Sequence, residues 1–267
     1  MKLAISNIAW EQHDDPDILE LLRTNGVTGI EVAPTKLWQD WKGASHKEAK
    51  EYKKVMQEQG FELPAIQAIL FGRPDLQLFD KSSHVAFLEH IKLVADLANG
   101  FGSKVMVFGA PKNRKRGQMP YSEAMEVAAE FFYKAGDICI EHECCIGLEH
   151  NPVEYGCDFA TNVLDVKELV QKVNNQGFKL HVDSAGLYMC GGEIDEMIHN
   201  VGEFVHYHIS EPMLEPIFDG VVDQKSGIET LRTIDYKEWV SIEMKQPASV
   251  ELLKKSLQDV KEIIFVK

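Results

Sequence analysis

Long hydrophobic runs are absent from this sequence. A membrane-spanning helix needs about 20 consecutive apolar residues, and no stretch of the 267-residue chain approaches that length. Met1 and Lys2 lead directly into a predicted strand rather than into a signal peptide. We therefore expect a cytoplasmic protein with no membrane partner.

Cysteine is scarce, and its spacing excludes two classes of small stabilised domain. The 5 cysteines are odd in number and include no Cys-x-x-Cys pair. A disulfide framework and a zinc knuckle are therefore not indicated. We expect free thiols at all of these positions, which are Cys139, Cys144, Cys145, Cys157 and Cys190.

Positive charge is also in deficit. The chain has 28 Lys and Arg residues against 42 Asp and Glu residues, which gives a formal net charge of -14. Such a charge repels polyanions, so we expect no nucleic-acid partner. The basic cluster at residues 112–117 is the exception to this acidic balance.

The apolar residues that are present suffice for one large core. The hydrophobic content is 45%, and α/β barrels form single units of about 250 residues. We see no linker or low-complexity tract, and we expect one domain over residues 1–267.

Hydrophobic periodicity predicts alternating strands and helices along the whole chain. The predicted strands are 3–8, 29–33, 63–69, 104–108, 146–149, 180–183, 205–208 and 239–242. The predicted helices are 17–24, 46–59, 82–98, 121–142, 161–174, 193–200, 227–232 and 248–264. Strands that alternate with helices in this way predict an α/β fold, specifically a single-domain (β/α)8 TIM barrel.

Four consecutive predicted strands end on an ionisable side chain. These residues are Glu149, Asp183, His208 and Glu243, and they are separated by 34, 25 and 35 residues. Each separation is close to the length of one strand-helix-strand unit. Because the carboxyl ends of barrel strands converge at one mouth, we expect the four side chains to meet there.

Carboxylate oxygens with one imidazole suit a divalent ion such as Mn²⁺, Mg²⁺ or Co²⁺, with Zn²⁺ as an alternative. The open alternative is that these polar side chains at the strand ends are only hydrated at the barrel mouth and bind no metal. His181 and His206 lie two positions deeper on their strands. We expect them in a second layer, where an imidazole hydrogen-bonds a neighbouring carboxylate.

The chain resembles the xylose isomerase-like TIM barrels. The motifs that carry the resemblance are Gly-Ile-Glu at 29–31, Gly-Leu-Glu at 147–149, His-Val-Asp at 181–183, His-Tyr-His-Ile-Ser-Glu at 206–211 and Ser-Ile-Glu-Met at 241–244. The family includes sugar isomerases and epimerases, inosose dehydratase and endonuclease IV. The resemblance implies one divalent ion held by Glu149, Asp183, His208 and Glu243. It also implies that Glu149 and Glu243 act as acid and base around a metal-stabilised enediolate.

The chain departs from two branches of that family. Gly186 and Leu214 stand where ketose 3-epimerases have a histidine and an arginine. Gln67 and the run at 108–111 stand where endonuclease IV has zinc-binding histidines. The particular 3-epimerase reaction and a DNA-repair activity are therefore not indicated.

Several further residues are candidates for contact with a substrate. Lys112 and Arg114, in the basic loop, are predicted to bind a phosphate or carboxylate, and the alternative is a solvated loop. Trp10 follows the first strand and is a candidate for stacking on a sugar face. The remaining candidates follow the fifth and seventh strands and are Glu154, Tyr155 and Glu211.

These observations predict a metal-dependent isomerase or epimerase of a sugar or sugar derivative, which is phosphorylated or otherwise anionic if the basic loop takes part. A dehydratase of the inosose dehydratase type would use the same enediolate and stays open. So does a barrel that binds a sugar or a protein partner without turnover. The expected partner is a small-molecule sugar, and assembly into a homo-oligomer is left open.

Overall fold

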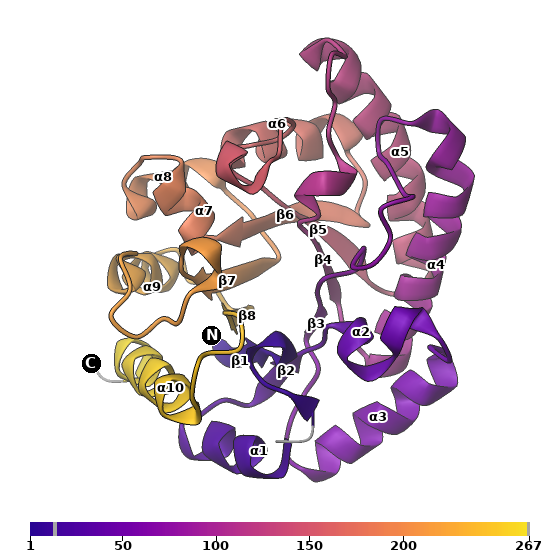
Figure 1. The fold of residues 1–267 in the computed structure, drawn as a ribbon. Coiled ribbons are helices and arrows are strands. Elements are labelled where there is room, and N and C mark those ends of the chain that lie inside the picture. Colours follow the sequence, from indigo (N-terminus) through magenta and orange to yellow (C-terminus); the bar gives the residue numbers. More distant parts are fainter. Residues whose placement is uncertain (13–14, 266–267) are drawn as a thin grey trace.

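The computed structural model describes residues 1–12 and 15–265, and its strands form one parallel sheet that curls into a barrel (Figure 1). The strand order is β2-β1-β8-β7-β6-β5-β4-β3. Backbone bridges from Gly29 to Glu62 and from Val32 to Ile66 bring the two edge strands together. The strands are β1 (Lys2–Ser6), β2 (Gly29–Glu31), β3 (Ala65–Ile66), β4 (Val105–Phe108), β5 (Cys145–Glu149), β6 (Phe178–Asp183), β7 (His206–Ser210) and β8 (Trp239–Glu243).

Helices cover the outside of the sheet, which confirms the predicted TIM barrel (Figure 1). They are α1 (Asp15–Thr24), α2 (Pro34–Leu37), α3 (His46–Glu58), α4 (His84–Phe101), α5 (Tyr121–Glu141), α6 (Val163–Val173), α7 (Ser184–Met189), α8 (Ile194–Val201), α9 (Gln224–Thr233) and α10 (Val250–Phe265). Among the residues described, no helix combines the length and the apolar character that crossing a bilayer requires.

The predicted elements were wrong in several details, of which those at β3 and after β6 bear on the barrel mouth. Strand β3 has only two residues, because Ala68 takes a left-handed conformation with φ of 54° and turns the chain away from the sheet. Helix α7 was not predicted, and it starts directly after β6. Asp183 caps it by accepting a hydrogen bond from the backbone N–H of Gly186 at 2.6 Å. This cap thus fixes one carboxylate oxygen of Asp183, which is a predicted metal ligand.

An aromatic cluster fills the space between the sheet and helices α4 and α5. Phe132 of α5 stacks on Phe178 of β6 with 4.4 Å between ring centroids, and it meets Phe108 of β4 edge-on at 5.3 Å. All three rings are buried. Since β4, β5 and β6 lie side by side, this packing sets the position of the strands that carry part of the barrel mouth.

We expect Phe132→Ala to lower the free energy of unfolding by about 3–5 kcal/mol, since it removes a buried ring and leaves a cavity. The adjacent Tyr133 is 52% exposed, and Tyr133→Ala should change that free energy by at most about 0.5 kcal/mol. Urea unfolding followed by circular dichroism measures both. Equal losses in the two variants would contradict the assignment of this cluster as a structural core.

Candidate functional site

The structure brings Glu149, Asp183, His208 and Glu243 together at the barrel mouth. One ligand atom from each lies within 4.8 Å of the ligand atoms of the other three. The strand register explains the convergence, because Asp183 of β6 lies opposite His208 of β7 and Glu243 of β8 lies opposite Ser210 of β7. Positions 208 and 210 are two residues apart, so their side chains lie on the same face of β7.

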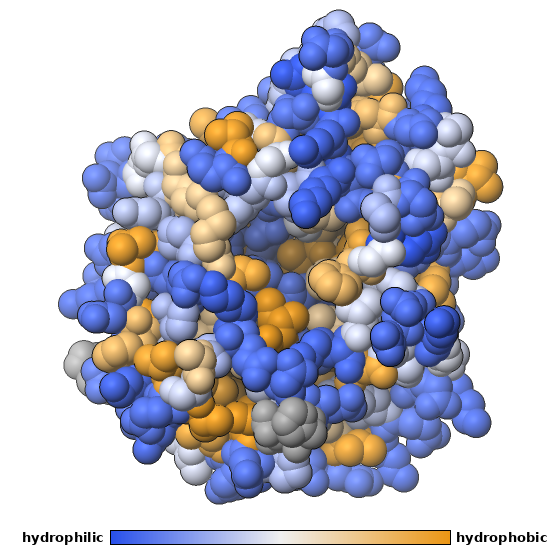
Figure 2. All heavy atoms as spheres, in the orientation of Figure 1, coloured by the Kyte–Doolittle hydropathy of each residue, from blue (hydrophilic) through white to orange (hydrophobic). Residues whose placement is uncertain are grey.

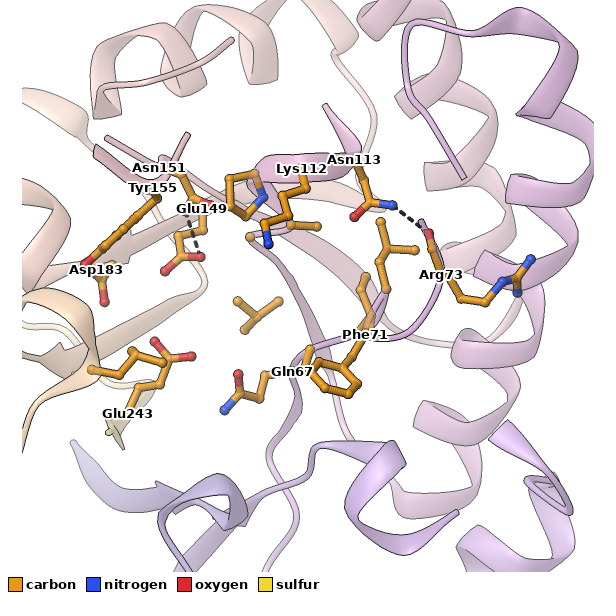
Figure 3. A pocket seen from close by; sticks show the side chains of 18 of the residues that line it. Gln67, Phe71, Arg73, Lys112, Asn113, Glu149, Asn151, Tyr155, Asp183 and Glu243 are labelled. Atoms are coloured by element: carbon orange, nitrogen blue, oxygen red, sulfur yellow. Dashed lines mark hydrogen bonds between the residues drawn. The ribbon is translucent and has the colours of Figure 1, made fainter. Parts of the chain in front are cut away.

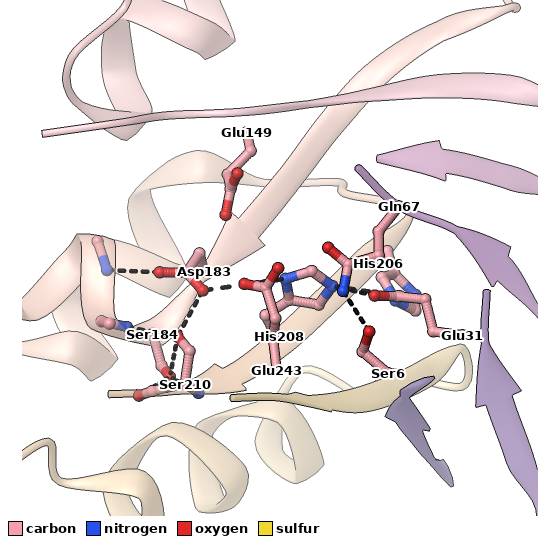
Figure 4. Close-up of polar contacts among 12 residues, drawn as sticks. Ser6, Glu31, Gln67, Glu149, Asp183, Ser184, His206, His208, Ser210 and Glu243 are labelled. Atoms are coloured by element: carbon pink, nitrogen blue, oxygen red, sulfur yellow. Dashed lines mark hydrogen bonds and ion pairs between the residues drawn. The ribbon is translucent and has the colours of Figure 1, made fainter. Parts of the chain in front are cut away.

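Glu31 at the end of β2 orients the imidazole of this group (Figure 4). His208 Nε2 lies 3.0 Å from one oxygen of Glu31 and 3.2 Å from the other. His206 Nε2 lies 2.6 Å from the same carboxylate. Because a carboxylate only accepts hydrogen bonds, each of these nitrogens carries a proton. The Nδ1 atom of His208 is thereby left to face the three acids.

Asp183 and Glu149 are held in place by their own contacts. Ser210 donates its hydroxyl to the second oxygen of Asp183. The side-chain amide of Asn151 donates to Glu149 Oε2 at 3.1 Å. Gly109 leaves the room that this carboxylate needs, since a Cβ there would lie 2.3 Å from Glu149 Oε2. These contacts fix the direction in which both acids point before anything binds.

Burial and neighbouring charges shift the pKa values at this site. Burial, followed by the charges of Glu243 and Asp183, raises the pKa of Glu149 to about 8. Burial and the charge of Glu243 raise the pKa of Asp183 to about 6. Burial alone would lower the pKa of His208, but Glu31 and Glu243 raise it well above its usual value. Acids crowded into a low dielectric repel one another, and a cation between them would relieve that repulsion.

The donor set at the mouth fits a divalent ion. Three carboxylates and one imidazole offer the oxygen and nitrogen ligands that such ions take. His208 Nδ1 is buried without a hydrogen bond to any described residue, although Glu243 Oε2 lies 3.2 Å away and Asp183 Oδ2 lies 4.0 Å away. A metal-binding imidazole commonly donates its other N–H to a carboxylate, as His208 does to Glu31.

Two deeper groups share His208 and are weaker candidates. In the first, Glu31 with His206 and His208, the facing nitrogens are already engaged by the carboxylate. In the second, Glu149 with His181 and His208, both ring nitrogens of His181 lack partners among the described residues. The His181 ring meets the His208 ring edge-on, with centroids 4.2 Å apart. The mouth group is the one that offers four ligand residues rather than three, and we keep it as the candidate centre.

A cavity of about 510 Å³ opens beside the quartet (Figures 2 and 3). Glu149, Asp183 and Glu243 line one end of it. The other walls come from the loop after β3 and the loop after β4, at 67–77 and 107–113. Figure 2 shows it as a hollow with apolar side chains around it. The site can therefore take a molecule much larger than a metal ion.

Three of the six residues predicted to contact substrate line this cavity. Lys112 extends into it in Figure 3 and has no ionic partner among the described residues. Tyr155 lines it, and its hydroxyl accepts a hydrogen bond from the backbone N–H of Met213 at 3.2 Å. Glu211 lines it as well, but its carboxylate accepts the backbone N–H of Val221 at 2.8 Å. Glu211 therefore holds the loop after β7.

The other three candidates do not line the cavity. Trp10 is buried, and Glu154 is exposed outside the cavity. Arg114 is fully buried, and its guanidinium donates to the backbone oxygen of Glu149 at 2.7 Å. The prediction that Arg114 binds a substrate anion is corrected accordingly, because its side chain is buried outside the cavity lining and donates to the backbone oxygen of Glu149.

The sequence pattern over residues 19–263 matches the family model described as xylose isomerase-like TIM barrel. The chain belongs to this family. A search of curated proteins finds no relative by sequence. The family assignment agrees with the barrel and with the acids at its mouth.

Solved structures of similar fold include sugar epimerases. A 3-keto-D-glucoside 4-epimerase from E. coli is 15% identical, with a TM-score of 0.82 over 98% of this chain and 99% of that chain. A D-psicose 3-epimerase is 13% identical, with a TM-score of 0.80 over 100% of both chains. The IolI protein with a zinc atom is 20% identical, with a TM-score of 0.70 over 99% of this chain and 95% of that chain. At such low identities the likeness establishes the fold alone.

We expect Glu31→Gln to weaken Mn²⁺ binding by about 10- to 100-fold, because the amide replaces one accepting oxygen with an NH₂ donor and removes the negative charge that orients the two imidazoles. Calorimetric titration of the metal-free protein measures this loss. The control is Glu62→Gln, which changes a carboxylate that is 59% exposed beside β3 and should leave the dissociation constant unchanged. An unaltered dissociation constant in Glu31→Gln would contradict its orienting role.

Proposed function

We propose that this protein is a divalent-metal-dependent isomerase or epimerase of a sugar or sugar derivative. The observation that carries the proposal is the convergence of three carboxylates and one unpartnered imidazole nitrogen beside a cavity. Family membership and the sugar epimerases of similar fold add support. We further propose a cytoplasmic enzyme that uses Mn²⁺, Mg²⁺ or Co²⁺, with Zn²⁺ as the alternative.

In this proposal Glu149, Asp183, His208 and Glu243 hold the ion. When bound, a divalent ion supplies Lewis acidity, which stabilises negative charge that develops on a sugar oxygen next to the carbon losing its proton. Asp183 is a fixed ligand, because Gly186 and Ser210 hold its two oxygens.

The two glutamates are proposed to move the proton. Glu149 comes from β5 and Glu243 from β8, with β6 and β7 between them, so they reach the cavity from different sides. One carboxylate takes the proton from the carbon beside the carbonyl, and the other returns a proton on the opposite face, which inverts the centre. Burial raises the pKa of Tyr155 to about 12. Its hydroxyl therefore stays protonated and is proposed to donate a hydrogen bond to a substrate oxygen.

Incubation of the Mn²⁺-loaded protein with ketoses in D₂O tests this function. We expect one deuterium in each isomerised or epimerised product, with no loss of water, by mass spectrometry. Glu149→Gln and Glu243→Gln should each lower the exchange rate by about 10²- to 10⁴-fold. Glu89→Gln, which changes an exposed acid on α4, is the matched control.

The outcomes separate the alternatives. A dehydrated product would replace the isomerase assignment with a dehydratase. Binding of a sugar without deuterium uptake, in wild type and in both glutamine variants, would favour a barrel that binds without turnover.

We also propose that Lys112 binds an anionic group of the substrate. Its ammonium group extends into the cavity without a counter-ion from the described residues (Figure 3). In a chain of net charge -14, such a cation would favour a phosphate or a carboxylate on the substrate. Arg114 takes no part, because it is buried and donates to the backbone oxygen of Glu149.

We expect Lys112→Ala to raise the KM for a phosphorylated or acidic sugar by about three- to tenfold and to leave a neutral sugar unaffected. Steady-state kinetics on a matched pair, such as fructose 6-phosphate and fructose, measures the difference. Lys115→Ala, in the same loop but outside the cavity lining, serves as the control. Equal effects of Lys112→Ala on the two sugars would rule out an anion subsite.

A further inference from the structure

The cavity has two chemically different ends. Acids line the end beside the quartet, whereas the loops after β3 and β4 supply an apolar arm. We define the apolar arm as Ile69, Leu70, Phe71, Pro74, Ala110 and Pro111. A volume of about 510 Å³ falls among cavities that bind drug-sized molecules, about 300–1,000 Å³. The arm therefore offers room for a second part of the bound molecule.

Phe71 is the most exposed large side chain of this arm. Its residue is 68% exposed, and its ring forms no ring contact with the described residues. In Figure 3 the ring lies across the cavity from Asp183. An aromatic face left open beside a cavity is a surface on which an apolar group gains burial.

The loop that carries Phe71 is fixed by hydrogen bonds. The indole N–H of Trp41 donates to the backbone oxygen of Phe71 at 2.9 Å. Asn113 donates its side-chain amide to the backbone oxygens of Arg73 at 2.8 Å and of Leu76 at 2.7 Å. The backbone that carries the exposed ring is therefore held in place before binding, and such preorganisation lowers the entropic cost of binding a ligand.

Apart from Lys112, the polar side chains beside the arm that line the cavity at Arg73, Gln77 and Asn113 are already engaged with the protein. Arg73 forms an ion pair with Asp75 at 2.7 Å. Gln77 donates its amide to the backbone oxygen of Pro74 at 3.0 Å, and both donors that Asn113 uses go to backbone oxygens. A second sugar ring would lose water there without gaining enough hydrogen bonds. A flat apolar group makes no hydrogen bonds with water, so its binding in the arm carries no such cost.

We infer that the substrate is a conjugate of a carbonyl-bearing sugar with a flat apolar group, such as an aryl glycoside of a keto sugar, and that the apolar group binds against Phe71 in the apolar arm. The inference rests on the proposed function for the placement of the sugar at the quartet. It makes Phe71 a specificity-determining residue, because free sugars would leave the arm unused.

Binding measurements test this inference without turnover. The Mn²⁺-loaded protein is titrated with 4-nitrophenyl and methyl β-D-glucosides, galactosides and xylosides, and with cellobiose. We expect at least one aryl glycoside to bind about tenfold more tightly than its methyl counterpart. Phe71→Ala should remove most of that gain, and Phe71→Trp should keep it. Val85→Ala changes another exposed apolar residue, which lies on α4 and is 77% exposed. This control variant should retain the tighter binding of the aryl glycoside.

Each contrary outcome identifies a different error. Aryl and methyl glycosides with equal affinity, or no binding of either, would overturn the inference. Tighter binding of cellobiose than of any aryl glycoside would make the arm a second sugar subsite. A lower assembly mass of Phe71→Ala by sedimentation would make the ring a contact between copies. An aryl preference that depends on Phe71 but comes without deuterium exchange would leave the inference intact and remove only the proposed function.

Discussion

The repulsion among three closely spaced carboxylates, one buried and two partly buried, is the constraint on which the rest of this site depends. Ligand atoms of Glu149, Asp183, Glu243 and His208 lie within 4.8 Å of one another, and among the described residues the imidazole of His208 pairs with these acids, with its Nδ1 3.2 Å from Glu243 Oε2. Like charges in a low dielectric destabilise one another unless a counter-charge is added. The barrel holds them there because core packing fixes the strands. In the proposed function, a bound cation would relieve this destabilisation.

A second layer of contacts fixes the positions of the residues in this arrangement. Glu31 accepts from both His206 and His208, Ser210 donates to Asp183, and Arg114 donates to the backbone of Glu149. Each contact restrains a group that would otherwise rotate to separate its charge from its neighbours. The cost of burying Glu31 is offset by its two imidazole partners, which keep its pKa low although burial opposes this.

The parts of the structure that could be predicted from the sequence follow from periodicity. A barrel aligns strand ends, so an ionisable residue at the end of each strand predicts a shared mouth. Whether a loop side chain is buried or exposed could not be predicted from periodicity. Arg114 was expected to bind a substrate anion at the barrel mouth, yet it lies buried, and its guanidinium donates to the backbone oxygen of Glu149. Helix α7 was missed because its six residues are too few to display a helical period.

The different roles of strands and loops explain why the meeting point of the four side chains was easier to predict than the walls of the cavity. Strand ends have fixed register, so Glu149 and Glu243 stay near the same point whatever the loops contain. The position of Phe71 instead depends on a left-handed Ala68 and on a hydrogen bond from Trp41, 30 residues away in the chain. No local pattern encodes such a contact, because both partners are ordinary in their own segments. Loops whose conformation depends on contacts between distant segments can change what a barrel binds, while the residues at its strand ends stay the same.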